Sequence, residues 1–181
     1  EMHVNIKGHV GYYCGGMNQK AVITIDGNAG TGLGENMMSG TIHVKGNTSQ
    51  SAGATAHGGT IIIDGNASSR CGISMKGVEI IVKGSVGHMS AFMAQTGTLL
   101  ICGDAGEALG DSIYETVIYI AGKPKSLGVD CIEKKLNKND LKKIESLLKI
   151  GKIKKLKPSN FKKYGSARKL YNFNIDNVSK Y

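Results

Sequence analysis

The sequence predicts an all-β fold, a right-handed parallel β-helix of about seven 19-residue coils, with a mainly helical or irregular basic C-terminal tail. Three observations support this prediction: a glycine recurs every 19 residues, aliphatic residues keep fixed distances from it, and the composition changes near residue 122. A repeat of this length indicates a solenoid, because each unit buries its apolar face only by stacking on its neighbours. The recurring glycines are Gly8, Gly27, Gly46, Gly65, Gly84, Gly103 and Gly122.

Each period contains one short segment, typical of a strand, that ends at the recurring glycine. These segments are HVNIKG, VITIDG, TIHVKG, TIIIDG, EIIVKG, TLLICG and VIYIAG, and most are rich in β-branched residues. Aliphatic residues lie four and two positions before each glycine, and a spacing of two places both columns on one face of the strand. The columns, expected to form the core, are Val4, Ile23, Ile42, Ile61, Ile80, Leu99 and Ile118, and Ile6, Ile25, Val44, Ile63, Val82, Ile101 and Ile120.

The hand of the solenoid follows from two arguments. Crossovers between parallel strands favour the right-handed form. A left-handed helix of six-residue units is the alternative, but 19 is not a multiple of six and the apolar residues do not recur every six positions. The right-handed form is therefore preferred.

The residue immediately before each recurring glycine alternates in charge over the first five coils. This position faces out of the strand, so neighbours in adjacent coils can form ion pairs, each worth roughly a few tenths of a kcal/mol. A slip by one coil would place like charges together, so this charge ladder is expected to fix the register. Its members are Lys7, Asp26, Lys45, Asp64 and Lys83, followed by Cys102 and Ala121.

A candidate docking surface lies on the outward face, three residues before each recurring glycine. The column is mostly polar in the first three coils and apolar in the last four. An apolar stripe on an outer face needs a cover, which either the chain's own tail or a partner protein provides. A partner interface through this apolar stripe is one hypothesis. Its residues are Ile62, Ile81, Leu100 and Tyr119.

Residues 1–122 and 123–181 differ enough in composition to form two units. The first carries six basic and nine acidic side chains, a net charge of −3, and the second carries seventeen basic and five acidic ones, a net charge of +12. Apolar residues at helical spacing predict one amphipathic helix over 138–150, with Asn139 as N-cap and Gly151 as its end. The tail is expected to dock on the β-helix or to cap its open end.

The basic tail also invites a nucleic-acid interpretation. Its lysines alternate with helix-forming apolar residues, and Arg168 is its single arginine, so a solvated lysine-rich surface is the stronger expectation.

No apolar run approaches the ~20 residues of a membrane span. The first residues lack a signal peptide, so a cytoplasmic protein is expected. The chain does not begin with methionine, which leaves open an upstream segment.

No metal or cofactor is expected to bind this chain. The loop Gly30–Gly34 resembles a nucleotide-binding glycine loop, but no helix follows it, as that fingerprint requires. The cysteines form no CxxC pair, and the histidines occupy five different repeat positions, so no ligand set converges. These residues are Cys14, Cys71, Cys102 and Cys131, and His3, His9, His43, His57 and His88.

An acidic cluster within 104–115 is the strongest candidate for catalysis. Two carboxylates beside Tyr114 could perform acid–base chemistry. No nucleophile or base partner accompanies them, so no catalytic residue is assigned, and an autonomous enzyme is the alternative hypothesis. The carboxylates are Asp104, Glu107, Asp111 and Glu115.

Several motifs together resemble a known family. GNAGTGLG, GNASSRCGISMKG, FMAQTG, CGDAGEALGDSIYE, SLGVDCIE and SARKLYNF are similar to the GXGXG-repeat domain at the C-terminal end of the glutamate synthase large subunit. The chain most resembles the stand-alone form of that domain, found where the enzyme is split into separate chains, and the resemblance spans about Lys20 to Phe173. Similar domains occur as separate chains in N-methylglutamate synthase and in formylmethanofuran dehydrogenase.

The resemblance implies a right-handed β-helix that assembles with other chains and performs no chemistry itself. A glutamine amidotransferase chain would release ammonia from glutamine. A synthase chain carrying FMN and an iron–sulfur cluster would combine that ammonia with 2-oxoglutarate to form glutamate. The resemblance therefore places the cofactors and catalytic residues on partner chains, and self-association is left open.

Overall fold

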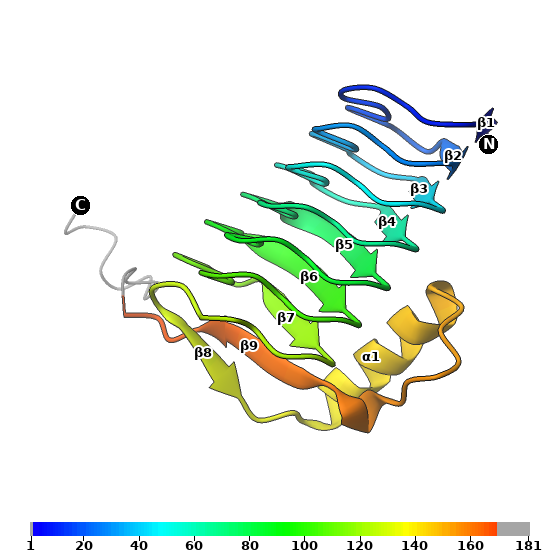
Figure 1. The fold of residues 1–181 in the computed structure, drawn as a ribbon. Coiled ribbons are helices and arrows are strands. Elements are labelled where there is room, and N and C mark those ends of the chain that lie inside the picture. Colours follow the sequence, from blue (N-terminus) through cyan, green and yellow to red (C-terminus); the bar gives the residue numbers. More distant parts are fainter. Residues whose placement is uncertain (1, 170–181) are drawn as a thin grey trace.

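The computed structural model describes residues 2–169, which form nine strands, one α-helix and one short 3-10 helix (Figure 1). The strands make one sheet in the order β1-β2-β3-β4-β5-β6-β7-β9-β8. The elements are β1 His3–Lys7, β2 Val22–Asp26, β3 Thr41–Val44, β4 Thr60–Ile63, β5 Lys76–Val82, β6 Thr96–Ile101, β7 Val117–Ile120, β8 Cys131–Lys134, α1 Lys138–Ile150, η1 Pro158–Asn160 and β9 Lys162–Ser166.

Strands β1 to β7 stack in parallel, one per 19-residue period. Val4 pairs with Ile23, and Ile23 pairs with Ile42, so the register advances by one period at each step. Figure 1 shows these strands side by side, with the coils following one another from the N-terminus. The seven strands are joined by crossovers into a β-solenoid of about six turns, which confirms the predicted fold class.

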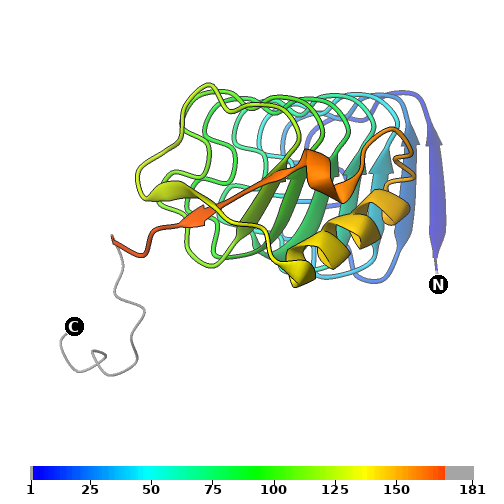
Figure 2. The same cartoon turned by 90° about the horizontal axis from the view of Figure 1, so that it is seen from below.

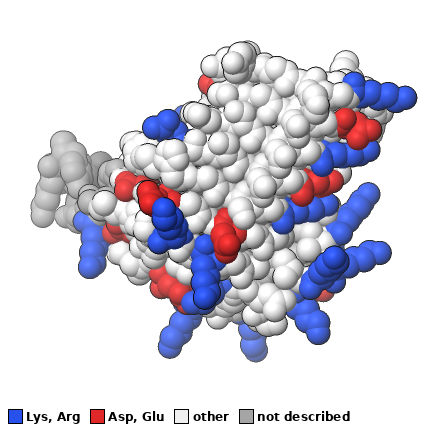
Figure 3. Space-filling model, in the orientation of Figure 1, with Lys and Arg blue, Asp and Glu red and all other residues white. Residues whose placement is uncertain are grey.

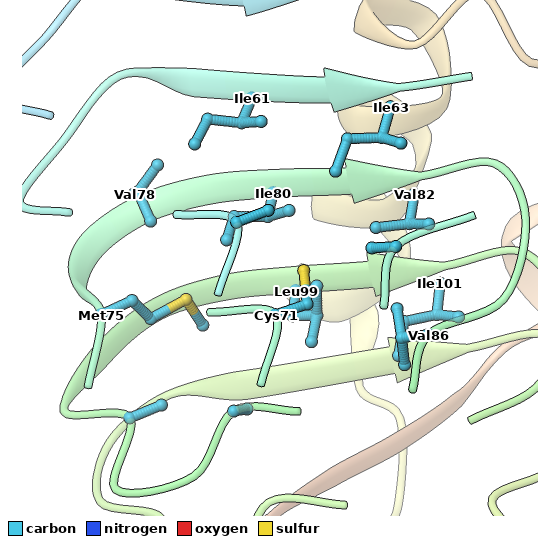
Figure 4. Close-up of a cluster of buried hydrophobic side chains, with 14 of the residues drawn as sticks. Ile61, Ile63, Cys71, Met75, Val78, Ile80, Val82, Val86, Leu99 and Ile101 are labelled. Atoms are coloured by element: carbon cyan, nitrogen blue, oxygen red, sulfur yellow. The ribbon is translucent and has the colours of Figure 1, made fainter. Parts of the chain in front are cut away.

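Both aliphatic columns face the interior, as predicted. Ile61, Ile80 and Leu99 are fully buried, and Figure 4 shows them on successive strands. Val4 and Ile6 in the first coil are only half-buried. The stacked periods therefore share one continuous core, to which the opposite wall contributes smaller or more flexible side chains such as Cys71, Met75 and Val86.

Glycine is required where neighbouring coils approach closely. A Cβ built on the recurring Gly65 would lie 2.8 Å from the carbonyl oxygen of Gly46 in the preceding coil. A second glycine column, seven residues after the recurring glycine in five of the coils, has a left-handed backbone and faces the core. A Cβ on Gly53, with φ +69°, would lie only 2.5 Å from the Ile80 Cδ1 atom. These two columns let the coils stack at the spacing of hydrogen-bonded strands.

The predicted charge ladder forms two ion pairs. Asp26 lies 3.5 Å from Lys45, and Asp64 lies 2.7 Å from Lys83. Each acidic side chain thus pairs with the lysine of the following coil. Figure 3 shows the alternating blue and red side chains along one edge of the molecule. Because the Asp26–Lys45 pair is exposed, its larger effect is on the register.

Strands β8 and β9 were not predicted from the sequence, and they close the C-terminal end of the solenoid. β9 pairs antiparallel with β7 on one side and with β8 on the other. An uncovered β7 edge would be a template for pairing with other chains. Within residues 131–166, β9 and β8 thus cover the β7 edge, whereas residues 170–181 of the tail lie outside the described residues.

Helix α1 occupies the predicted range, but its N-cap is Asn137 rather than Asn139. The Asn137 side chain accepts hydrogen bonds from the backbone N–H groups of Asn139 and Asp140, and Asp140 Oδ2 accepts one from the Asn137 N–H. This reciprocal capping box satisfies more free N–H groups than a cap at Asn139 alone. Gly151 ends the helix, as predicted.

Candidate functional site

The apolar stripe lies beneath the chain's own tail. Its four side chains are at most 7% exposed. Figure 2 shows α1 running across the outer face of the parallel strands. The tail is therefore the cover, because it brings a second apolar face to the stripe within the same chain. This corrects the partner-interface hypothesis, since no free docking surface is presented by Ile62, Ile81, Leu100 and Tyr119.

Three side chains of α1 form its packing face, namely Ile144, Leu147 and Leu148. Phe161 joins them from the segment that leads into β9. An ion pair between Lys143 and Glu79 of β5 adds a polar contact beside this second core. The tail is thus packed against β4 to β7 through a hydrophobic cluster of its own, separate from the interior of the solenoid.

A buried polar network fixes the first turn of α1 to the last coil. The Tyr119 hydroxyl donates to Asp140 Oδ1 over 2.7 Å, and Lys163 of β9 lies 2.8 Å from the same oxygen. Burial alone would raise the pKa of Asp140, but hydrogen bonds from Lys163 and Tyr119 outweigh it and hold that pKa below 3.8. Burial and the bond to Asp140 raise the pKa of Tyr119. The network joins β7, α1 and β9, and each of its three titratable side chains is bonded within it.

Asp140→Asn is expected to lower the free energy of unfolding at pH 7 by about 1–3 kcal/mol, because the amide loses the charge that pairs with Lys163. Since the native pKa of Asp140 is lowered, its contribution is full above pH 3.8 and is lost as the pH falls through the native pKa. Melting curves of both proteins, followed by circular dichroism from pH 7 to pH 2, measure this difference. A gap of the same size at every pH would contradict the charged network.

The acidic cluster within 104–115 is divided among structural contacts. Asp104 accepts from the Lys123 N–H, Glu107 pairs with Lys125, and Glu115 pairs with Arg168. Asp111 accepts from the Ser112 hydroxyl and the Val129 N–H. The four carboxylates thus tie the sixth coil to the segments that follow it. Each of the four carboxylates contacts different partner residues.

The cysteines and two of the histidines serve packing or local contacts. All four cysteines are free thiols, and burial raises the pKa of Cys71 to about 12. His43 Nε2 lies 2.9 Å from Asp64 Oδ1, and His9 Nδ1 accepts from the Asn28 N–H. Within residues 2–169, no group of three or more His, Cys, Asp or Glu side chains is placed to hold a metal ion.

A polar ladder next to the recurring glycines was missed by sequence reasoning. Asn28 Oδ1 accepts a hydrogen bond from the Asn47 N–H, and Asn47 Oδ1 accepts one from the Asn66 N–H. The ladder of hydrogen bonds continues through Ser85 to Asp104. Each side chain satisfies a backbone donor of the next coil. The repeated Gly-Asn, Gly-Ser and Gly-Asp pairs were the available signal.

Asn47→Ala is expected to lower the free energy of unfolding by about 0.5–1.5 kcal/mol, because the Asn66 N–H loses its acceptor. Asn47→Ser is the matched control, since Ser85 performs the same role two coils later. Urea unfolding measures both variants, and the serine variant should recover part of the loss. Equal losses in the two variants would show that the hydrogen bond does not stabilise the corner.

The loop Gly30–Gly34 is a corner of the solenoid. The Gly30 N–H donates to the Val10 carbonyl, and the Gly34 N–H donates to the Cys14 carbonyl, so these backbone groups pair neighbouring coils.

The tail lysines lie largely at the surface, and Figure 3 shows basic side chains gathered at the end that carries α1. None of the helices within residues 2–169 combines the length and apolar character needed to cross a bilayer.

Comparison with known proteins agrees with the repeat architecture. Protein GlxC of Rhizobium meliloti (strain 1021) is 64% identical over 178 residues, which cover 98% of this chain and 78% of that protein. A model of the GXGXG motif family matches residues 1–174, which include the solenoid and most of the tail. The chain belongs to the GXGXG motif family.

Proposed function

We propose that this chain is a non-catalytic assembly subunit of a cytoplasmic, glutamate synthase-type oxidoreductase. The observation that carries the proposal is the GXGXG family match across residues 1–174, together with the resemblance of GDSIYE and SARKLY to the glutamate synthase branch. The complex would convert glutamine and 2-oxoglutarate to glutamate. A glutamine amidotransferase chain and an FMN and iron–sulfur synthase chain would perform the chemistry.

The contacts of the titratable side chains support a structural role. Asp104, Glu107, Asp111 and Glu115 each hold a neighbouring segment of the fold. The buried carboxylate Asp140 is committed to Tyr119 and Lys163. A rigid solenoid with its polar groups used in this way is suited to hold other subunits at a fixed spacing.

Affinity purification of the tagged chain from its own cells, followed by mass spectrometry of the co-eluting chains, tests the proposal. Recovery of a glutamine amidotransferase chain and an FMN-binding synthase chain is expected, and the tag alone is the control. Recovery of molybdopterin- or tungstopterin-binding chains would instead indicate a formylmethanofuran dehydrogenase, and N-methylglutamate synthase chains would indicate that enzyme. Recovery of no chain would contradict the assembly role.

A further inference from the structure

A hollow of about 500 Å³ lies between the solenoid and the segment that follows α1. Lys83 and Cys102 line it on the solenoid side, and residues 152–156 line it on the other. Ile153 and Leu156 lie partly buried against the second core, so apolar atoms form much of the wall. The hollow therefore offers an apolar recess at the surface.

The end of the charge ladder makes room for this recess. Lys83 is the last charged member of the ladder, and it pairs with Asp64 of the preceding coil. The next two members are Cys102 and Ala121, whose small side chains lie partly buried at the margin of the second core. A continued ladder would have filled this space with an acidic side chain that paired with Lys83.

Lysines surround the recess, and three of them have no acidic partner. Lys152, Lys154 and Lys155 are exposed, and within residues 2–169 no carboxylate lies within ion-pair distance of them. A second hollow of about 410 Å³ on the same segment adds Lys149, which pairs with Glu145, and Lys157. Within residues 2–169, the chain therefore does not neutralise this patch itself.

We infer that this lysine-rimmed hollow is a docking site for an acidic segment of a partner protein, which inserts an apolar side chain into the recess. Charge complementarity identifies the occupant: several unpaired lysines favour Asp- and Glu-rich chain, and the apolar wall favours an aliphatic or aromatic anchor. The inference deepens the proposed function, because it names the surface through which this chain meets another one.

A protein fits this surface better than a nucleic acid. Proteins that bind single strands stack bases on aromatic side chains and commonly use arginine at the backbone. Residues 149–157 contain neither an aromatic residue nor an arginine. The lysines would attract phosphates as well, but the apolar wall formed by Ile153 and Leu156 suits an apolar side chain, which a phosphate backbone does not offer.

The first test reverses two charges beside the recess. Lys154→Glu/Lys155→Glu is expected to raise the dissociation constant of the purified complex at least about tenfold, because two attractions become repulsions. Lys135→Glu/Lys138→Glu makes the same change in net charge at the opposite end of α1, where both lysines are exposed, and is expected to leave the constant within about twofold. Equal effects of the two double variants, or none from the first, would overturn the inference.

The second test identifies what occupies the recess. A photo-crosslinking amino acid placed at position 152, which lines both hollows, is irradiated in the intact complex. Mass spectrometry should find an acidic peptide with an apolar residue at the link. A nucleic-acid adduct, or a peptide without acidic residues, would overturn the inference. An acidic peptide from a protein other than a glutamate synthase chain would uphold the surface and refute the proposed function.

Discussion

Ile81→Glu is expected to detach the C-terminal tail from the solenoid. Ile81 is fully buried, and it lies at the centre of the second core beneath α1. Burying an unpaired carboxylate there would cost several kcal/mol, so the chain avoids the cost by releasing the helix. The free energy of unfolding should fall by about 3–5 kcal/mol, which lowers the melting temperature by roughly 10 °C.

Hydrogen exchange measured by mass spectrometry locates this effect. Peptides that cover α1 and β9 should lose protection, whereas those that cover β2 to β4 should keep it. Asn5→Glu places the same carboxylate at the same repeat position in the first coil, where the side chain is exposed. That control should change stability by no more than about 0.5 kcal/mol. Unchanged protection of α1 in Ile81→Glu would contradict the second core.

Gly53→Ala is expected to lower the free energy of unfolding by about 2–4 kcal/mol. The left-handed backbone costs an L-residue about 1–2 kcal/mol, and overpacking a core adds about 1–3 kcal/mol. Ala91 occupies this repeat position two coils later with φ 57°, so the backbone conformation itself is accessible to alanine. The contact of the new Cβ with Ile80 Cδ1, at 2.5 Å, therefore decides the size of the effect.

Gly11→Ala is the matched control for this substitution. No heavy atom lies within 4 Å of a Cβ built on Gly11, and its φ is not positive. Its effect on the free energy of unfolding should stay within about 0.5 kcal/mol. A small stabilisation is expected, because alanine restricts the conformations of the unfolded chain. Urea unfolding of both variants gives the comparison. Equal effects at Gly53 and Gly11 would show that the second glycine column does not govern stacking.

Periodicity made the solenoid predictable, because each of its strands repeats the same chemistry. The columns through Ile61 and Ile63 specify one buried face, and the recurring glycine specifies the register. The tail offers no such redundancy. β9 reads KKYGS, in which neither alternation nor β-branched residues indicate a strand, and it becomes one only because the β7 edge needs a partner.

The candidate site was harder to predict for the same reason. Sequence identified the apolar stripe correctly as a surface that needs a cover, and it also identified the apolar face of the helix. The sequence alone did not show that the stripe and the helix pack against each other, because their contact depends on how the chain turns after Gly122. The Tyr119–Asp140 bond and the lysine-rimmed hollow arise from that same turn.

The proposed role of this chain is to assemble a complex without performing any of its chemistry. The most direct measurement is the rate of glutamate formation from glutamine and 2-oxoglutarate by the purified chain, alone and after its co-purified partner chains are added. We expect no turnover by the chain alone, and turnover in the complex that Asp111→Asn leaves unchanged. Turnover by the isolated chain that Asp111→Asn abolishes would contradict the claim.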